Sequence, residues 1–184
     1  MKKLLLIAAL GYFGAANAQR FGATAGFAVL NARVTVPGYY DSTGMQFPSQ
    51  DASDSQPGGY FGVFAELGVG NNFKFLPGIN LLMAKDSRAL QVPLMFKYYI
   101  QSAFNFGVGP QLTFDLGNVP AEFKNYYNRT NIGAAFGLGY DFKNSLGIEA
   151  RYGIQLNDHI KGIARDGGAS AKLNVINLGL NYKF

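Results

Sequence analysis

The sequence predicts an all-β protein, an eight-stranded antiparallel up-and-down transmembrane β-barrel, and three observations support this. Eight segments alternate apolar and polar residues with a period of two, which is typical of strands with two unlike faces. After residue 18, no apolar run approaches the roughly 18 residues that a membrane helix needs. The chain also contains 24 Gly, 16 Phe and 11 Tyr, and this composition is typical of β-barrels.

The first residues have the pattern of an export signal. Lys2 and Lys3 precede a short apolar run, and Ala16-Asn17-Ala18 is a small-residue cleavage site. This three-part pattern is typical of secretory signal peptides. We therefore expect residues 1–18 to be removed and residues 19–184 to form a single domain, the barrel.

Four strands are expected in the first half of the exported chain, each with an apolar face opposite a polar or small one. They cover about 20–34, 58–70, 73–84 and 89–100. The segment 35–57 is rich in Pro, Gly, Ser and Asp, which predicts a long loop. Pro77 lies inside the third strand, and because proline cannot donate to a ladder, we expect a bulge there.

Four more strands are expected in the second half, at about 103–116, 130–142, 145–156 and 172–184. Each of the eight has at least the ~9–11 residues that a tilted span of the hydrocarbon core requires. The connections after the second, fourth and sixth strands are about two residues long, and the other four are longer. Outer-membrane barrels have short periplasmic turns and long outer loops, so we expect both termini in the periplasm.

A soluble barrel of the lipocalin type would show the same alternation, but with its apolar face inside. Three features favour the membrane barrel instead. Glycine, which suits a crowded interior, lies on the polar face; the long loops lie at one end only; and the last strand carries a continuous apolar face. That face consists of Ile176, Leu178, Leu180, Tyr182 and Phe184.

A sequence resemblance supports the same fold. The segment from Leu90 to Tyr99, L-Q-V-P-L-M-F-K-Y-Y, and the following Gly107-Val108-Gly109-Pro110 resemble the PorT family, small outer-membrane β-barrel domain proteins with an OmpA/OmpX-like eight-stranded barrel. The resemblance implies a bacterial outer-membrane protein, and one family member is tied to protein secretion. Leu180, Tyr182 and Phe184 also resemble the C-terminal signal that the barrel-assembly machinery recognises.

Charged residues on the polar faces are expected inside the barrel: Glu66, Lys74, Lys97, Asp115, Asp141, Glu149, Arg151 and Lys183. The interior of an eight-stranded barrel holds only side chains, and unpaired charges there cost several kcal/mol each. We expect Glu149 and Arg151 to form an ion-pair network with Glu66 and Lys97. Such a network can act as a structural plug, which we favour, or as a gated or proton-conducting path.

His159, the single histidine, is expected to be a solvated residue of the last loop. A lipid-modifying enzyme could use a serine, a histidine and an acid, and Asp158 and Ser170 are nearby in sequence. Nothing in the spacing brings a nucleophile into hydrogen-bond reach of the histidine. We therefore expect no catalytic site, no cofactor and no metal site, and a small, scattered positive charge excludes a nucleic-acid surface.

The sequence thus predicts a monomeric outer-membrane barrel with a structural or interaction role and no catalysis. The expected partners are outer-membrane lipid and lipopolysaccharide, the barrel-assembly machinery during insertion, and a protein bound through the outer loops. Two alternatives remain: an accessory component of a protein-secretion machine, and a narrow pore for small solutes.

Overall fold

The structure, a computed structural model, describes residues 20–40, 43–85, 87–101, 103–117, 127–160 and 168–184. The expected signal peptide, residues 1–18, lies outside the described residues. Within them, no helix is long and apolar enough to cross a membrane.

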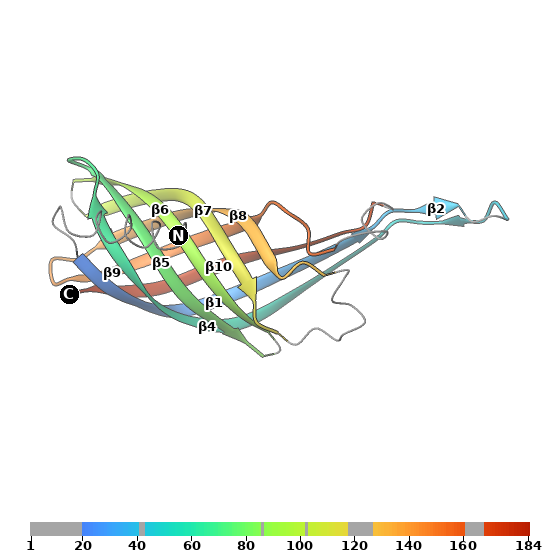
Figure 1. The fold of residues 1–184 in the computed structure, drawn as a ribbon, viewed down its shortest axis with the longest axis horizontal. Coiled ribbons are helices and arrows are strands. Elements are labelled where there is room, and N and C mark those ends of the chain that lie inside the picture. The colour runs from blue at the N-terminus through green and yellow to red at the C-terminus, as the bar shows by residue number, and fades with distance from the viewer. Residues whose placement is uncertain (1–19, 41–42, 86, 102, 118–126, 161–167) are drawn as a thin grey trace, which may run out of the picture.

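Eight strands close into an antiparallel barrel in the order β1-β10-β9-β8-β7-β6-β5-β4 (Figure 1), which confirms the predicted fold class. Their bounds are β1 Arg20–Val36, β4 Gln50–Gly68, β5 Phe73–Ala84, β6 Arg88–Ile100, β7 Phe104–Asp115, β8 Thr130–Asp141, β9 Leu146–Gln155 and β10 Ser170–Lys183. Seven of the eight predicted strands agree with these bounds to within two residues. Because β1 also pairs with β10, the wall has no free edge.

The prediction that residues 35–57 form a loop is wrong for much of this segment. β1 and β4 remain paired as far as Val36 and Gln50, well beyond the last β4–β5 pair at Gly58 and Ala84. A small hairpin of β2 (Tyr39–Tyr40) and β3 (Gln46–Phe47) follows. Figure 1 shows this extension of β1 and β4 projecting from one end of the barrel. We call residues 29–57 the ribbon.

The prediction of a bulge at Pro77 is also wrong. Leu76 pairs with Met95 and Asn80 with Gln91, so β5 and β6 keep one register on both sides of the proline. The β4–β5 register is likewise unchanged, although pairs are missing from the ladder beside Pro77. The strands therefore accommodate the lost donor by a local interruption of pairing, without an inserted residue.

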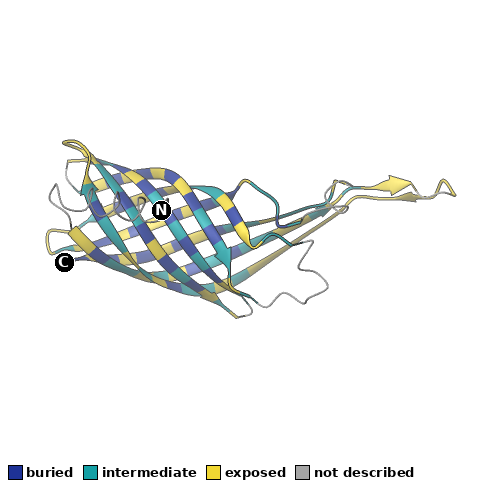
Figure 2. Cartoon of the chain, in the orientation of Figure 1, coloured by how far each residue is buried: buried dark blue, intermediate teal, exposed yellow. Residues whose placement is uncertain are grey.

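The two faces of each strand differ sharply in exposure (Figure 2). Apolar side chains such as Val63, Phe96 and Leu180 are more than half exposed on the outer wall, while the inner face is largely polar. The lipocalin-type arrangement is thereby excluded. Two apolar clusters nevertheless lie inside. The first contains Ala28, Leu30, Tyr60, Leu82, Ala89 and Val175, and the second contains Leu76, Met95 and Ala135.

The barrel has two distinct ends. The connections 69–72, 101–103 and 142–145, all short, define the turn end, and the ribbon, the short connection 85–87 and the long connections 116–129 and 156–169 define the ribbon end. The backbone N–H of Phe184 donates to the carbonyl oxygen of Phe21 at 2.8 Å. The start of β1 and the end of β10 therefore meet at the turn end.

Candidate functional site

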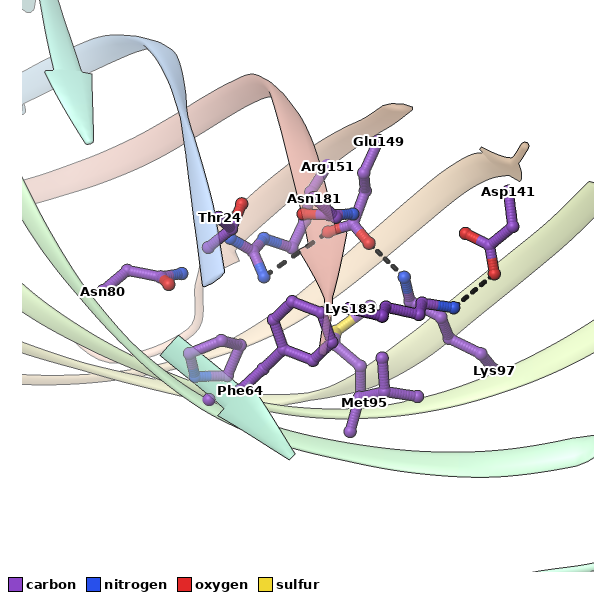
Figure 3. A pocket seen from close by; sticks show the side chains of 13 residues that line it. Thr24, Phe64, Asn80, Met95, Lys97, Asp141, Glu149, Arg151, Asn181 and Lys183 are labelled. Carbon is purple, nitrogen blue, oxygen red and sulfur yellow. Dashed lines mark hydrogen bonds and ion pairs between the residues drawn. The ribbon is translucent and has the colours of Figure 1, made fainter. Parts of the chain in front are cut away.

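A charged cluster fills the barrel interior near the turn end (Figure 3). Lys97 Nζ donates to Glu149 Oε2, and Arg151 Nη1 lies 3.6 Å from Glu149 Oε1. All three side chains are less than a tenth exposed. With its amide oriented to satisfy both of its groups, Asn80 also accepts from Arg151 Nη2 at 2.8 Å. Three of the four residues of the predicted network thus lie together on β6 and β9.

Glu66, the fourth predicted residue, belongs to a neighbouring cluster. Lys74 Nζ and Lys183 Nζ lie 2.6 and 2.7 Å from its two carboxylate oxygens. Lys183 also contacts Asp141 Oδ2, and Tyr99 OH donates to Glu66 Oε2 at 3.4 Å. Tyr99 is not among the residues predicted for the network, although it lies on the same inward face of the strand as Lys97, two residues earlier.

The space between the two clusters is small. The cavity between them has a volume of about 30 Å³, and its lining includes Lys97, Glu149, Arg151 and Lys183. A second lumen cavity, lined by residues such as Gln111 and Gln155, holds about 20 Å³. A single water requires roughly 10–15 Å³. Each cavity therefore holds at most a few waters, which fits a filled lumen better than a channel.

Several buried amides in the lumen lack a protein partner. Gln91, Asn105 and Asn177 are at most 1% exposed, and within the described part of the chain neither the amide nitrogen nor the oxygen of any of them has a hydrogen-bond partner. Buried polar groups are normally satisfied, often by ordered water. These amides are therefore positions where lumen waters would bind.

A third polar cluster lies at the ribbon end, and it corrects the expectation for His159. This side chain is only 8% exposed and stacks on Tyr127, with 5.2 Å between the ring centroids. His159 Nδ1 lies 3.3 Å from the carbonyl oxygen of Asn128, and Nε2 lies 3.2 Å from Asn131 Nδ2. A carbonyl only accepts, so Nδ1 carries the hydrogen and Nε2 accepts from the amide. His159 is thus a buried structural residue.

The nearby acids have other partners. Tyr127 OH donates to Asp115 Oδ2 at 2.6 Å, and Ser170 Oγ donates to Asp158 Oδ1 at 2.7 Å. The structure therefore does not bring Ser170 to His159, and a nucleophile needs such contact with its base. In the parts of the chain that are described, no group of acids and His could hold a metal ion.

The pKa of His159 should lie below the usual value of about 6.5. Burial lowers the pKa because it disfavours the imidazolium, and this outweighs the opposite effects of the Asn128 carbonyl, Asp115 and Asp158. The unfolded chain then binds the proton first, so His159 lowers the folding stability as the pH falls below about 6.5. NMR titration of this single imidazole measures the pKa directly, and a value at or above 6.5 would contradict the prediction.

The stability consequence has its own control. His159→Gln cannot take up the proton, so its unfolding midpoint should fall less between pH 7 and pH 5 than that of the unchanged protein. Equal pH dependence of the two proteins would show that His159 does not contribute.

The outer surface carries an aromatic belt at the turn end. Ring centroids are 4.9 Å apart for Phe73 and Tyr98, and 5.5 Å apart for Tyr182 and Phe184. Leu180, in the same outward row of β10 as Tyr182 and Phe184, is 58% exposed. The three residues of the predicted assembly signal therefore form one exposed apolar row on the outside of the barrel.

Comparisons with known proteins agree with this architecture. Residues 83–161, less than half of the chain, match the family described as outer membrane protein beta-barrel domain. No curated protein sequence matches. Among solved structures, the outer membrane protein AlkL in lipid bilayers is similar, with 15% identity, a TM-score of 0.50, and 91% coverage of both chains.

Two further structures are similar at lower scores. OprG from Pseudomonas aeruginosa has 17% identity, a TM-score of 0.49, and coverage of 91% of this chain and 96% of its own. Neisserial surface protein A has 15% identity, a TM-score of 0.49, and coverage of 91% and 100%. The closed strand order and the AlkL likeness together give this protein the fold of a small eight-stranded outer-membrane barrel.

Proposed function

We propose that the protein is an integral bacterial outer-membrane barrel with a filled lumen, and that its role is structural or interactive rather than catalytic. The outer wall supports contact with lipid, because large apolar side chains line the outward face of every barrel strand. A closed barrel leaves no unpaired strand edge in the hydrocarbon, which makes this wall compatible with a bilayer.

The two ends support an orientation. Aromatic residues of outer-membrane barrels gather at the membrane interfaces, and short turns face the periplasm. The turn end has both features, so it would face the periplasm together with the start of β1 and the end of β10. The ribbon would then project from the cell. The barrel-assembly machinery would recognise the row formed by Leu180, Tyr182 and Phe184. Lipopolysaccharide would surround the opposite end of the barrel.

The ribbon is the observation that carries the interaction role. Among the described residues, Gln50–Pro57 of β4 pair only with β1, so one edge of this segment has no strand partner there. At the end of the ribbon, Tyr40 is 69% exposed, and the ring of Tyr39 stacks on that of Phe47 at 4.8 Å. An open strand edge and exposed aromatic rings are both typical of protein-binding surfaces.

Site-specific crosslinking from the ribbon tests this role. A photoreactive phenylalanine in place of Tyr40, in intact outer membranes, should crosslink one protein in a stoichiometric amount. The same replacement at Tyr140, at the turn end, is the matched control and should not give that product. An accessory role in secretion, as the PorT resemblance suggests, would yield a secretion component as the crosslinked protein.

A truncation separates the ribbon from the barrel. Arg33 and Ser53 are paired across the ribbon, so a two-residue Asn-Gly turn can join them. This variant should fold, which is checked by the difference in its gel migration before and after heating. It should no longer crosslink to or co-purify with the partner. Retention of the partner, or crosslinking of lipid alone from Tyr40, would argue against an interaction role for the ribbon.

The pore alternative makes a different prediction. In planar bilayers the purified protein should conduct no more than the lipid background, because the lumen cavities of about 30 and 20 Å³ hold only isolated waters. A conductance well above background that disappears in Arg151→Ala would support a narrow solute pore instead. The ribbon-truncated variant is the control, since a pore should conduct without the ribbon.

A further inference from the structure

A pocket occupies the mouth of the barrel at the turn end. This turn-end pocket has a volume of about 580 Å³, and its lining residues come from β1, β5, β8, β9, β10 and the turns that follow β6 and β8. Its volume falls within the roughly 300–1,000 Å³ typical of sites for small molecules. Asp141 and Lys183 also line the cavity of about 30 Å³ beneath it (Figure 3), so the pocket ends on a charged floor with room for only a few waters below.

Most charged residues of the pocket stand on inward rows of the wall. Lys74 and Lys183 contact Glu66, which is 4% exposed in the lumen, and Asp141 contacts Lys183. Arg20 is the direct partner of Glu66 across the β1–β4 ladder. Directly opposed residues of an antiparallel pair project from the same face, with about 4.5–5.5 Å between their Cβ atoms. Arg20 therefore stands at the mouth of the lumen beside Glu66, although it is exposed.

Three cations gather around the carboxylate of Glu66. Lys74 Nζ and Lys183 Nζ lie 2.6 and 2.7 Å from its two oxygens, and Arg20 stands opposite on β1. Lys183 is also shared with Asp141. In the described part of the chain, Arg20 has no carboxylate within ion-pair distance. Both oxygens of Glu66 are already bound, so this end of the lumen holds more positive charge than its own acids balance.

The charges of this whole end show the same excess. Six cations and three carboxylates lie in the lumen and on the rim of the turn end: Arg20, Lys74, Lys97, Lys143, Arg151 and Lys183 against Glu66, Asp141 and Glu149. Residues 19–184 carry three more Lys and Arg than Asp and Glu, so the remaining sequence is balanced. An α-carboxylate at Phe184 would reduce the excess to two. A mouth of one charge sign with low-dielectric walls concentrates counter-ions.

We propose that the turn-end pocket binds a phosphate monoester, whose phosphate contacts Arg20 and Lys74 above Lys183. These cations come from three strands, so an anion with three tetrahedral oxygens can reach all of them, whereas a carboxylate has two oxygens in one plane. A phosphate monoester also carries close to two negative charges at pH 7, and an arginine binds two of its oxygens at once. Gln101 and Ser145 line the pocket as well and can donate to the rest of the ligand.

Two kinds of molecule supply this group: a soluble ester, and the headgroup of a phosphatidic acid. The lining also includes Phe142, Leu146 and Phe184, whose side chains are exposed on the outer wall. A lipid could place its chains against these three residues and its phosphate inside the rim. Either source leaves the lumen closed, and the site is independent of the partner proposed for the ribbon.

Calorimetry with glycerol 3-phosphate tests the proposal on the full chain in phosphatidylcholine nanodiscs, with empty nanodiscs subtracted. The ester should bind at one site, acetate should bind at least about tenfold more weakly, and uncharged glycerol should not bind. Arg20→Gln should weaken glycerol 3-phosphate about tenfold, the size of one charge-assisted contact. Arg129→Gln removes an exposed arginine at the ribbon end, so it makes the same change in net charge and should bind like the unchanged protein.

Native mass spectrometry distinguishes the two sources. The protein is released from nanodiscs of phosphatidylcholine with phosphatidic acid, and Arg20-dependent retention of one phosphatidic acid would assign the site to the lipid headgroup. Binding of glycerol 3-phosphate without such retention would assign it to a soluble ester. Both variants should show the shift in gel migration on heating that marks a folded barrel. Equal affinity for acetate, equal effects of Arg20→Gln and Arg129→Gln, or no saturable binding together with no Arg20-dependent retention would each overturn the proposal.

Discussion

Replacing Glu149 by leucine should destabilise the barrel by about 3–5 kcal/mol, the size typical of removing one partner from a buried ion pair. Glu149 is the carboxylate that Lys97 and Arg151 share, and all three side chains are almost fully buried. Without it, two cations would remain in the lumen with no carboxylate in contact. Urea unfolding in lipid vesicles, followed by tyrosine fluorescence in this Trp-free chain, measures the change.

The exposed pair Arg33–Asp51 is the control for this prediction. Its side chains are 69% and 57% exposed, so Asp51→Ala should cost no more than about 1 kcal/mol. The double variant Lys97→Met with Glu149→Leu leaves only one cation uncompensated. It should therefore be more stable than Glu149→Leu alone. If Glu149→Leu is no worse than Asp51→Ala, the cluster does not stabilise the fold.

The strand pattern was predictable because a bilayer-sized barrel requires the same alternation in every strand. β5 was predicted to the residue, because its apolar row from Phe73 to Met83 has no interruption. The outer half of β4 was not predictable in the same way. Residues 50–57 are mostly polar, with charges at Asp51 and Asp54, and end in Pro57. Pairing with β1 makes them a strand, and composition within the segment does not reveal a partner.

The lumen charges were predictable as a set but not as pairs. The alternation of residues along each strand predicts which charges point inward. Which of them form ion pairs depends on the stagger between strands: Glu66 pairs with Lys74 and Lys183, and Glu149 pairs with Lys97. A single sequence does not contain that stagger. His159 was misjudged for a related reason. Its burial comes from Tyr127 and Asn131, which reach it from elsewhere in the chain.

The glycine of the Gly-Pro pair on β7 provides a second large expected effect. A Cβ added to Gly109 would lie 1.9 Å from the carbonyl oxygen of Leu94 on β6. The β6–β7 ladder is interrupted at this point, where Pro110 has no N–H to donate. The two backbones therefore approach at a position that only glycine can occupy. This contact gives a physical reason for the Gly-Pro sequence.

Gly109→Ala should accordingly destabilise the barrel by about 1–3 kcal/mol, because a backbone atom has to move to admit the methyl group. Gly137 on the neighbouring strand β8 is the matched control, since its added Cβ would find its nearest atoms at 3.5 Å. Gly137→Ala should be neutral or stabilising by up to about 1 kcal/mol, because alanine restricts the unfolded chain more than glycine does. Urea unfolding of both variants in the same vesicles compares them directly. Equal midpoints would show that β6 and β7 separate easily at Gly109, and that the close approach does not constrain the wall.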